Sequence, residues 1–360
     1  MLSKYDDLLI HQTPYPLETM ATTDLRAFDR FFFNLHDTSG EFALDFGGGV
    51  YPNLDVMDGF AVAEFDDSQW NLRASRELKG ADRAETVIGP LRFEVVEGLR
   101  KWRISLAENG YGISFDLEFV ARAQPIEYHV NAMKGHWVTV DMHHYNQPGR
   151  YSGWLKIGNR SWEVTTDRVY GHRDRSWGVR MGVGGLSPVG RELPGRGLTL
   201  WLPAQFEDRC IILHYSEDLQ GNPLSCRGAV LYEDGSVSAP FVKLQHDITF
   251  DPASRVHKTS TLLITDASGK TERLESRQLL RGIRLSGAGY DGRHGAYRGE
   301  AHLEGERWDL KAPSEQLKRG AIGQLVDQLV EYRNGHDVGY GIYQHMIGAG
   351  HYRYGVKHPG

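Results

Sequence analysis

The residues whose types and spacing could move protons lie between positions 171 and 178. His172, Asp174 and Ser176 alternate with other residues, so an extended backbone places their side chains on one face. The intervening positions, two arginines and Trp177, take the opposite face. An imidazole next to a carboxyl group can donate and accept protons. The same pattern also fits a buried, salt-bridged corner of a β-structure, because structural ion pairs gather the same residue types.

A predicted β-hairpin directly precedes this segment in the sequence. Residues 151–157 and 160–165 have the character of strands, and Gly158-Asn159 between them suits a two-residue turn with positive φ. The chain has eight tryptophans and 17 tyrosines, and such rings can line an apolar ligand cavity or fill a barrel interior. Four of the tryptophans fall close together in the sequence: Trp137, Trp154, Trp162 and Trp177.

The stretch from Trp137 to Arg180 resembles the hydroxyneurosporene synthase (carotenoid 1,2-hydratase) and AttH-like group. The family pattern Tyr-His-Asp-His-Asn-Trp-Gly is similar to residues 172–178, where Arg173 and Arg175 replace the two family histidines. A weaker similarity lies at Gly339-Tyr-Gly-Ile-Tyr343. Members of the group consist of two lipocalin-like β-barrels, so the resemblance implies that fold for this chain.

The resemblance implies a cofactor-independent lyase or isomerase that acts on a hydrophobic terpenoid or polyketide-like molecule. Asp174 would donate a proton to a carbon–carbon double bond or remove one from carbon, and His172 would orient or activate water. An aspartate with its ordinary pKa of about 4 is ionised at neutral pH, so to act as the acid Asp174 would need a pKa raised by burial.

Aromatic residues would complete the expected site. Trp177, Trp137 and Tyr170 could stabilise a developing carbocation through their ring faces, and Trp154 belongs to the same expected substrate-binding set. Tyr340 or Tyr343 would close the pocket. Two other functions fit the same fold: a non-catalytic carrier of a hydrophobic molecule, and a cyclase that only folds a polyene for a pericyclic reaction.

Alternating apolar and polar residues predict strands along most of the chain, and hence an all-β protein. A glycine- and proline-rich stretch over 182–197 divides it into two predicted lipocalin-like β-domains, residues 1–185 and 186–360. One C-terminal α-helix is predicted over 314–333, because apolar residues recur there every three or four positions and Asn334-Gly335 suits a helix end.

Charge and composition indicate which kinds of partner and which cellular location to expect. The formal net charge is −6 with acids and bases intermixed, which gives no basic face for nucleic acid. Two cysteines, no signal-peptide pattern and no long apolar run predict a cytoplasmic protein without a membrane-spanning segment. The predicted partner is a hydrophobic small molecule. A homodimer is a further expectation for the assembly of the protein.

No sequence motif predicts a cofactor or a metal. Asp45-Phe46-Gly47 and His172-Arg173-Asp174 mimic two protein-kinase motifs, but their order along the chain is reversed and Gly47-Gly48-Gly49 lacks the pattern of a phosphate-binding loop. The histidines between residues 129 and 172 lack the spacing of a known zinc motif. An enzyme of this kind would therefore rely on proton transfer or on folding its substrate.

Overall fold

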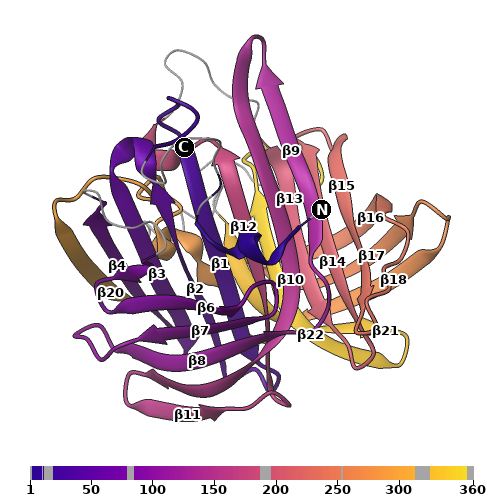
Figure 1. Cartoon of the computed structure of the whole chain (residues 1–360). Coiled ribbons are helices and arrows are strands. Elements are labelled where there is room, and N and C mark those ends of the chain that lie inside the picture. The colour runs from indigo at the N-terminus through magenta and orange to yellow at the C-terminus, as the bar shows by residue number, and fades with distance from the viewer. Residues whose placement is uncertain are drawn as a thin grey trace.

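The computed structural model describes residues 2–9, 11, 19–78, 85–186, 196–252, 254–312 and 325–354. Over these residues the chain forms two curled, antiparallel β-sheets that lie side by side, as Figure 1 shows. None of the helices in these ranges has the length and apolar character needed to cross a bilayer. The all-β prediction is therefore confirmed for the described part of the chain.

The first sheet contains 13 of the described strands, in the order β20-β4-β3-β2-β1-β12-β10-β8-β7-β6-β5, with β9 and β11 also paired to β10. Its strands are β1 (Ala27–Asp37), β2 (Phe42–Tyr51), β3 (Val56–Phe65), β4 (Ser68–Glu77), β5 (Val87–Ile88), β6 (Leu91–Glu97), β7 (Lys101–Leu106), β8 (Ile113–Ala121), β9 (Ile126–Lys134), β10 (Trp137–Ile157), β11 (Arg160–Val164), β12 (Val169–Val179) and β20 (Ala301–Asp309).

The second sheet contains nine of the described strands, in the order β15-β14-β13-β22-β21-β18-β17-β16, with β19 paired to β21. They are β13 (Arg196–Gln205), β14 (Arg209–Asp218), β15 (Pro223–Tyr232), β16 (Phe241–Phe250), β17 (His257–Asp266), β18 (Thr271–Gln278), β19 (Ile283–Arg284), β21 (Val326–Asn334) and β22 (Asp337–Ile347). Short 3₁₀ turns complete the described elements: η1 (Lys4–Asp7), η2 (Pro52–Leu54), η3 (Val183–Gly185) and η4 (Leu285–Ala288).

The hairpin predicted before the His172 segment is confirmed. Strands β10 and β11 pair as far as Ile157 and Arg160, and Gly158 in the turn has a φ of +59°. Only glycine adopts this left-handed conformation at little cost. The turn therefore has the geometry that its sequence requires.

The predicted helix over 314–333 is wrong where the structure describes it, because residues 326–334 form strand β21. Residues 313–324 lie outside the described ranges. Strand β21 is a central strand with both faces covered: Val330 packs in the interior of the second sheet, whereas Leu329 faces the first sheet. A strand buried on both faces loses its polar–apolar alternation and can imitate a helical period. Gly335 sits in the β21–β22 hairpin turn, with a φ of +62°.

The predicted boundary between residues 185 and 186 falls between β12, in the first sheet, and β13, in the second. Most of the stretch predicted to join two domains, residues 187–195, lies outside the described residues. Strand β20 departs from a simple division, because it comes from the second half of the chain but pairs with β4 in the first sheet. The division into two domains stays a prediction.

The three largest apolar clusters among the described residues form the core around the site. On β1 the odd-numbered residues, such as Phe31 and Phe33, pack inside the curl of the first sheet. The even-numbered Phe32 points the other way, into a cluster that draws on both sheets. A third cluster fills the interior of the second sheet. We call the mixed set the inter-sheet cluster; it consists of Phe32, Ala43, Phe60, Val62, Trp201, Ile283, Leu285, Ala288, Leu329 and Ile342.

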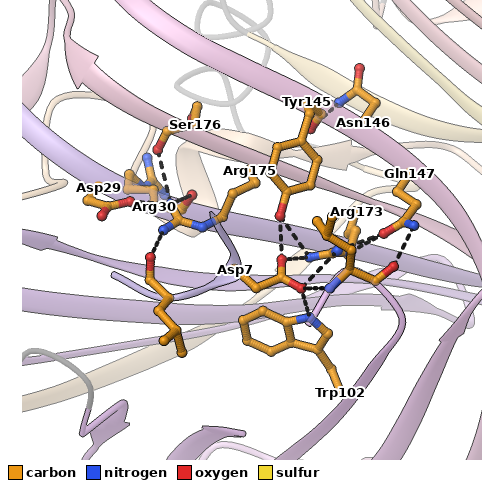
Figure 2. Close-up of polar contacts among 12 residues, drawn as sticks. Asp7, Asp29, Arg30, Trp102, Tyr145, Asn146, Gln147, Arg173, Arg175 and Ser176 are labelled. Atoms are coloured by element: carbon orange, nitrogen blue, oxygen red, sulfur yellow. Dashed lines mark hydrogen bonds and ion pairs between the residues drawn. The ribbon is translucent and has the colours of Figure 1, made fainter. Parts of the chain in front are cut away.

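Two buried ion pairs hold β12, one to the N-terminal segment and one to β1 (Figure 2). Arg173 is fully buried and binds the carboxylate of Asp7, which also accepts hydrogen bonds from Tyr145 and Trp102. Burial opposes ionisation, but the positive charge of Arg173 and these hydrogen bonds hold the pKa of Asp7 below its ordinary value.

The second ion pair repeats this arrangement one step further along β12. Arg175 binds Asp29 of β1, and its guanidinium also donates to the backbone carbonyl of Leu8 at 2.6 Å. Both arginines alternate with His172 and Asp174 on β12 and therefore lie on the opposite face of the strand. Neither arginine is an ion-pair partner of Asp174.

We predict that Asp7→Asn lowers the free energy of unfolding by about 3–5 kcal/mol, because it leaves Arg173 as a buried cation without a counterion. A urea titration followed by tryptophan fluorescence measures the change. The folded-state pKa of Asp7 lies below its unfolded value. Its contribution is therefore present above about pH 4 and lost as the pH falls further.

Asp116→Asn is the matched control, since Asp116 pairs with the exposed Arg103 at 2.8 Å. Exposed pairs of this kind contribute less than about 1 kcal/mol. Equal effects of the two substitutions would contradict the structural role assigned to the Asp7–Arg173 pair.

Candidate functional site

The face of the first sheet that meets the second sheet carries three rows of side chains across β12, β1, β2 and β3. In the first row, His172 aligns with Asn34 and Asp45. In the second, Asp174 aligns with Phe32 and, past Gly47, with Phe60; in the third, Ser176 aligns with Arg30 and, past Gly49, with Asp58. Successive rows lie two residues apart along a strand, or about 7 Å.

Glycines provide the space for the larger side chains of these rows. A Cβ atom at Gly49 would lie 2.2 Å from Cγ of Arg30, and one at Gly47 would lie 3.1 Å from the ring of Phe60. The Gly47-Gly48-Gly49 run therefore lets an arginine and an aromatic ring lie across the surface of β2.

Asp174 is the carboxylate of the second row and is partly accessible. Its Oδ2 atom lies 3.3 Å from Nε2 of His144 on β10, and its side chain is 25% exposed. Among the described residues this histidine is its ion-pair partner, rather than either neighbouring arginine. Asp174 can therefore exchange protons with an imidazole and with a molecule that reaches the face.

His172 of the first row is fully buried, two positions before Asp174 on β12. Its backbone N–H donates to Oδ1 of Asn34 at 3.0 Å, and its two ring nitrogens have no hydrogen-bond partner among the described residues. Burial lowers the pKa of His172 well below its ordinary value, and the nearby His36 and Arg122 lower it further. The ring therefore stays neutral at physiological pH.

The second sheet contributes the opposite wall and one further carboxyl group. Trp201, Leu329 and Ile342 of the inter-sheet cluster cover the face from that side. Asp327 of β21 is also buried there, and its Oδ1 atom accepts a hydrogen bond from Gln344 at 2.7 Å. Hydrogen bonds fix the two sheets together at this level: Gln205 donates to the carbonyls of Gly149 and Gly171 at 3.0 and 2.7 Å.

Asp45 and Asp327 form a pair of interacting buried carboxyls, one from each sheet. Burial raises the pKa of Asp45 well above its ordinary value, and the charges of Asp327 and Glu64 raise it further. Burial likewise raises the pKa of Asp327, with a contribution from Asp174. Two such groups cannot both ionise cheaply, so the pair retains a proton near neutral pH. This arrangement can supply an acid.

Several buried polar atoms between the sheets have no hydrogen-bond partner among the described residues. Such atoms are rare in folded proteins and call for an explanation, for which a bound polar molecule is one candidate. They are the two ring nitrogens of His172, Nδ2 of Asn34, both carboxyl oxygens of Asp45, Oδ2 of Asp327, Nε1 of Trp201, and Nε and Nη1 of Arg30. We call this group of residues, with Asp174, the inter-sheet site.

A pocket opens to the surface at the third row. It is lined by Asp58 and His294, next to Arg30, and further by Gly59, Arg73, Ala74, Ser75, Ala288, Gly289, Arg293, Ala296, Arg298, His302 and Glu304. The inter-sheet site therefore borders solvent at its Arg30 end.

The structure does not bring the expected aromatic residues together around Asp174. Trp177 lies on the opposite face of β12 and stacks on His11, with ring centroids 3.7 Å apart. Trp137 lies at the start of β10, under the guanidinium of Arg26. Trp154 is 44% exposed on β10.

The expected tyrosines are also spread out. Tyr170 shares the face of His172 but stacks against Arg150, whose guanidinium lies 4.4 Å from the ring centre. Tyr343 is buried inside the second sheet and stacks on His257. Tyr340 pairs in register with Gln205, near the junction of the two sheets. The apolar wall of the site consists of the inter-sheet cluster instead of the clustered tryptophans.

Comparison with known proteins agrees with this architecture. A family of unknown function (DUF8625) matches residues 2–357. The chain belongs to this family. No curated protein matches the sequence.

Solved structures with TM-scores above 0.5 show the same fold at low sequence identity. An AttH-like protein from Nitrosomonas europaea is 11% identical, with a TM-score of 0.51 over 96% of this chain and 99% of that one. CghA, also solved with Sch210972, is 10% identical, with a TM-score of 0.52 over 90% and 89%. A kievitone hydratase from Nectria haematococca is 9% identical, with a TM-score of 0.48 over 94% of each chain. The predicted resemblance to AttH-like proteins is thus confirmed for the fold.

Three charged residues of the site were not predicted from the sequence. Asp45 interrupts a run of aromatic, aliphatic and glycine residues on β2, and Arg30 stands between Asp29 and three phenylalanines on β1; both strands are buried on both faces. A charge inside such a run is the signal that could have identified them, since it is expensive unless it serves a purpose. Asp327 gave no comparable signal, because its segment was predicted as a helix.

We predict that Asp327→Asn stabilises the protein at pH 8 by a few degrees in melting temperature and that the gain shrinks toward pH 5. The pKa of Asp327 is raised to about 7 in the folded protein, above its unfolded value. The wild type therefore loses stability as the pH rises through about 4 to 7, whereas asparagine cannot ionise. Melting curves across this pH range test the sign.

Asp247→Asn, at a carboxylate that is 80% exposed, is the control and should show no such pH dependence. A variant at Asp327 that is less stable than the wild type at every pH would contradict the raised pKa.

Proposed function

We propose that the protein is a cofactor-independent lyase or isomerase that binds a hydrophobic, terpenoid or polyketide-like molecule between two lipocalin-like barrels. The observation that supports this most directly is the set of unpaired buried polar atoms inside an otherwise apolar junction. An apolar wall with a few convergent polar groups is the usual form of a small-molecule site.

In this proposal the three carboxyl groups of the inter-sheet site have different roles: one pair acts as the acid and the third group acts as the base. The protonated Asp45–Asp327 pair donates a proton to one carbon of a double bond. Asp174, which faces the same site and pairs with His144, accepts a proton in return. If that proton comes from an attacking water, the product is a hydrated substrate; if it comes from a neighbouring carbon, the double bond moves.

His172 supports this reaction without changing its charge. As a neutral imidazole with two unpaired nitrogens, it can accept a hydrogen bond from water and donate one to a polar group of the substrate. The aromatic rings of Phe32, Phe60 and Trp201 face the same site and can stabilise positive charge on carbon.

A reaction in D₂O tests the proposal with a panel of terpenoid alkenes and polyketide-like polyenes that raise the melting temperature of the protein. Mass spectrometry distinguishes the outcomes, because hydration adds the elements of D₂O and isomerisation through protonation introduces one deuterium. We predict that Asp45→Asn and Asp174→Asn each lower turnover by about 10²–10⁴-fold while ligand binding persists.

Asp116→Asn, on the outer surface of the first sheet, should retain wild-type turnover. Product formation without deuterium, unaffected by either substitution, would favour the cyclase that only folds a polyene. Binding without any product would favour the carrier.

A further inference from the structure

Arg30 is a buried cation whose hydrogen-bonding capacity is mostly unused. Its side chain is 3% exposed, and its Nη2 atom lies 3.3 Å from Nε2 of His294. Its Nε and Nη1 atoms have no hydrogen-bond partner among the described residues. Arginine binds carboxylates through two parallel N–H groups, formed by Nη2 together with either Nε or Nη1. His294 can accept only one of the two Nη2 hydrogens, so one such fork stays free for an anionic group.

The surroundings hold Arg30 in this position. Nδ1 of His294 lies 3.3 Å from Oδ2 of Asp58, and the same oxygen accepts a hydrogen bond from the backbone N–H of Gly295 at 2.7 Å. When the Nδ1–H group of His294 donates its hydrogen bond to Asp58, the lone pair on Nε2 is free to accept one from Arg30. Gly49 leaves room for the arginine stem, since a Cβ atom there would overlap it.

A second cation lies next to the first. Arg180 directly follows β12, and its guanidinium lies 4.8 Å from the ring centre of Phe28 and 5.9 Å from that of Tyr290. Arg30 lies over the same Tyr290 ring at 5.2 Å. Among the described residues, no carboxylate comes within ion-pair distance of either guanidinium. Two adjacent cations that make no direct ion pair favour an anion between them.

We propose that Arg30 and Arg180 bind an anionic oxygen group, of the carboxylate or enolate class, carried by the otherwise apolar substrate. This inference rests on the proposed function, because it places the charged end of that substrate at the third row of the inter-sheet site. Asp58 of this row and the neighbouring His294 line the surface pocket, so the charged group lies toward solvent while the apolar part enters between the sheets. Arg30 lies four positions before Asn34 on β1, a distance of about 13 Å, and Asn34 pairs in register with the acid Asp45.

The orientation has a chemical consequence for the substrate. Asp174 lies in the row between Arg30 and Asp45 and interacts electrostatically with both arginines. A molecule fixed at its anionic end would therefore present a carbon several bonds away to Asp174 and to the acid. The arginines select for a monoanion with an extended apolar or conjugated body.

Two matched fluorescent probes test this: 8-anilinonaphthalene-1-sulfonate, a monoanion, and N-phenyl-1-naphthylamine, which has the same aromatic skeleton without the charge. Titration of the full chain gives a Kd for each. We expect the wild type to prefer the anion and Arg30→Gln and Arg180→Gln each to weaken its binding by about tenfold or more. Both variants should keep the wild-type Kd for the neutral probe.

Arg103→Gln removes a cation that is 61% exposed on the first sheet and should leave both Kd values unchanged. Arg180 is less buried than Arg30, so it decides the question if Arg30→Gln does not fold. Equal binding of both probes, or anion binding unaffected by Arg180→Gln, would overturn the anion site while leaving the proposed function intact. Failure of the wild type to bind either probe would overturn both.

Discussion

The ion pairs of Arg173 and Arg175 with Asp7 and Asp29 fix the strand on which the site depends. Strand β12 is the point where the interior of the first sheet and the junction with the second sheet meet, and its side chains alternate between them. The buried ion pairs hold one face, and the other face carries His172 and Asp174. A buried ion pair adds little net stability over an apolar replacement, but the loss of one partner leaves an uncompensated buried charge and is strongly destabilising.

Alternation explains both the success and the limits of prediction from this sequence. Strands with one wet face, such as β7 and β8, are predictable because polar and apolar residues alternate along them. Strands β2 and β21 are covered on both faces, so their sequences carry no such alternation. The helix predicted over 314–333 failed at β21 for this reason.

The site was predicted only in part. Asp174 and His172 stand together on the junction face, as their spacing indicates, and their roles remain a proposal. Asp45 and Asp327 come from opposite ends of the chain and interact only through the packing of the two sheets. No local pattern reports such a contact. The tryptophans that cluster in the sequence separate in space, because a long strand such as β10 carries neighbours away from one another and alternates them between faces.

Strand β20 has a consequence for how the protein is made. More than 200 residues separate it from β4, its partner in the first sheet. During synthesis the N-terminal half leaves the ribosome with the edge of β4 unpaired. Strand β20 can pair with this edge only after most of the second sheet has been translated. Such long-range pairing slows folding, and an open strand edge invites pairing with other chains. Expression of residues 1–185 alone would therefore yield a protein with an exposed edge, prone to aggregate, and nascent chains would need protection there until residue 309 emerges.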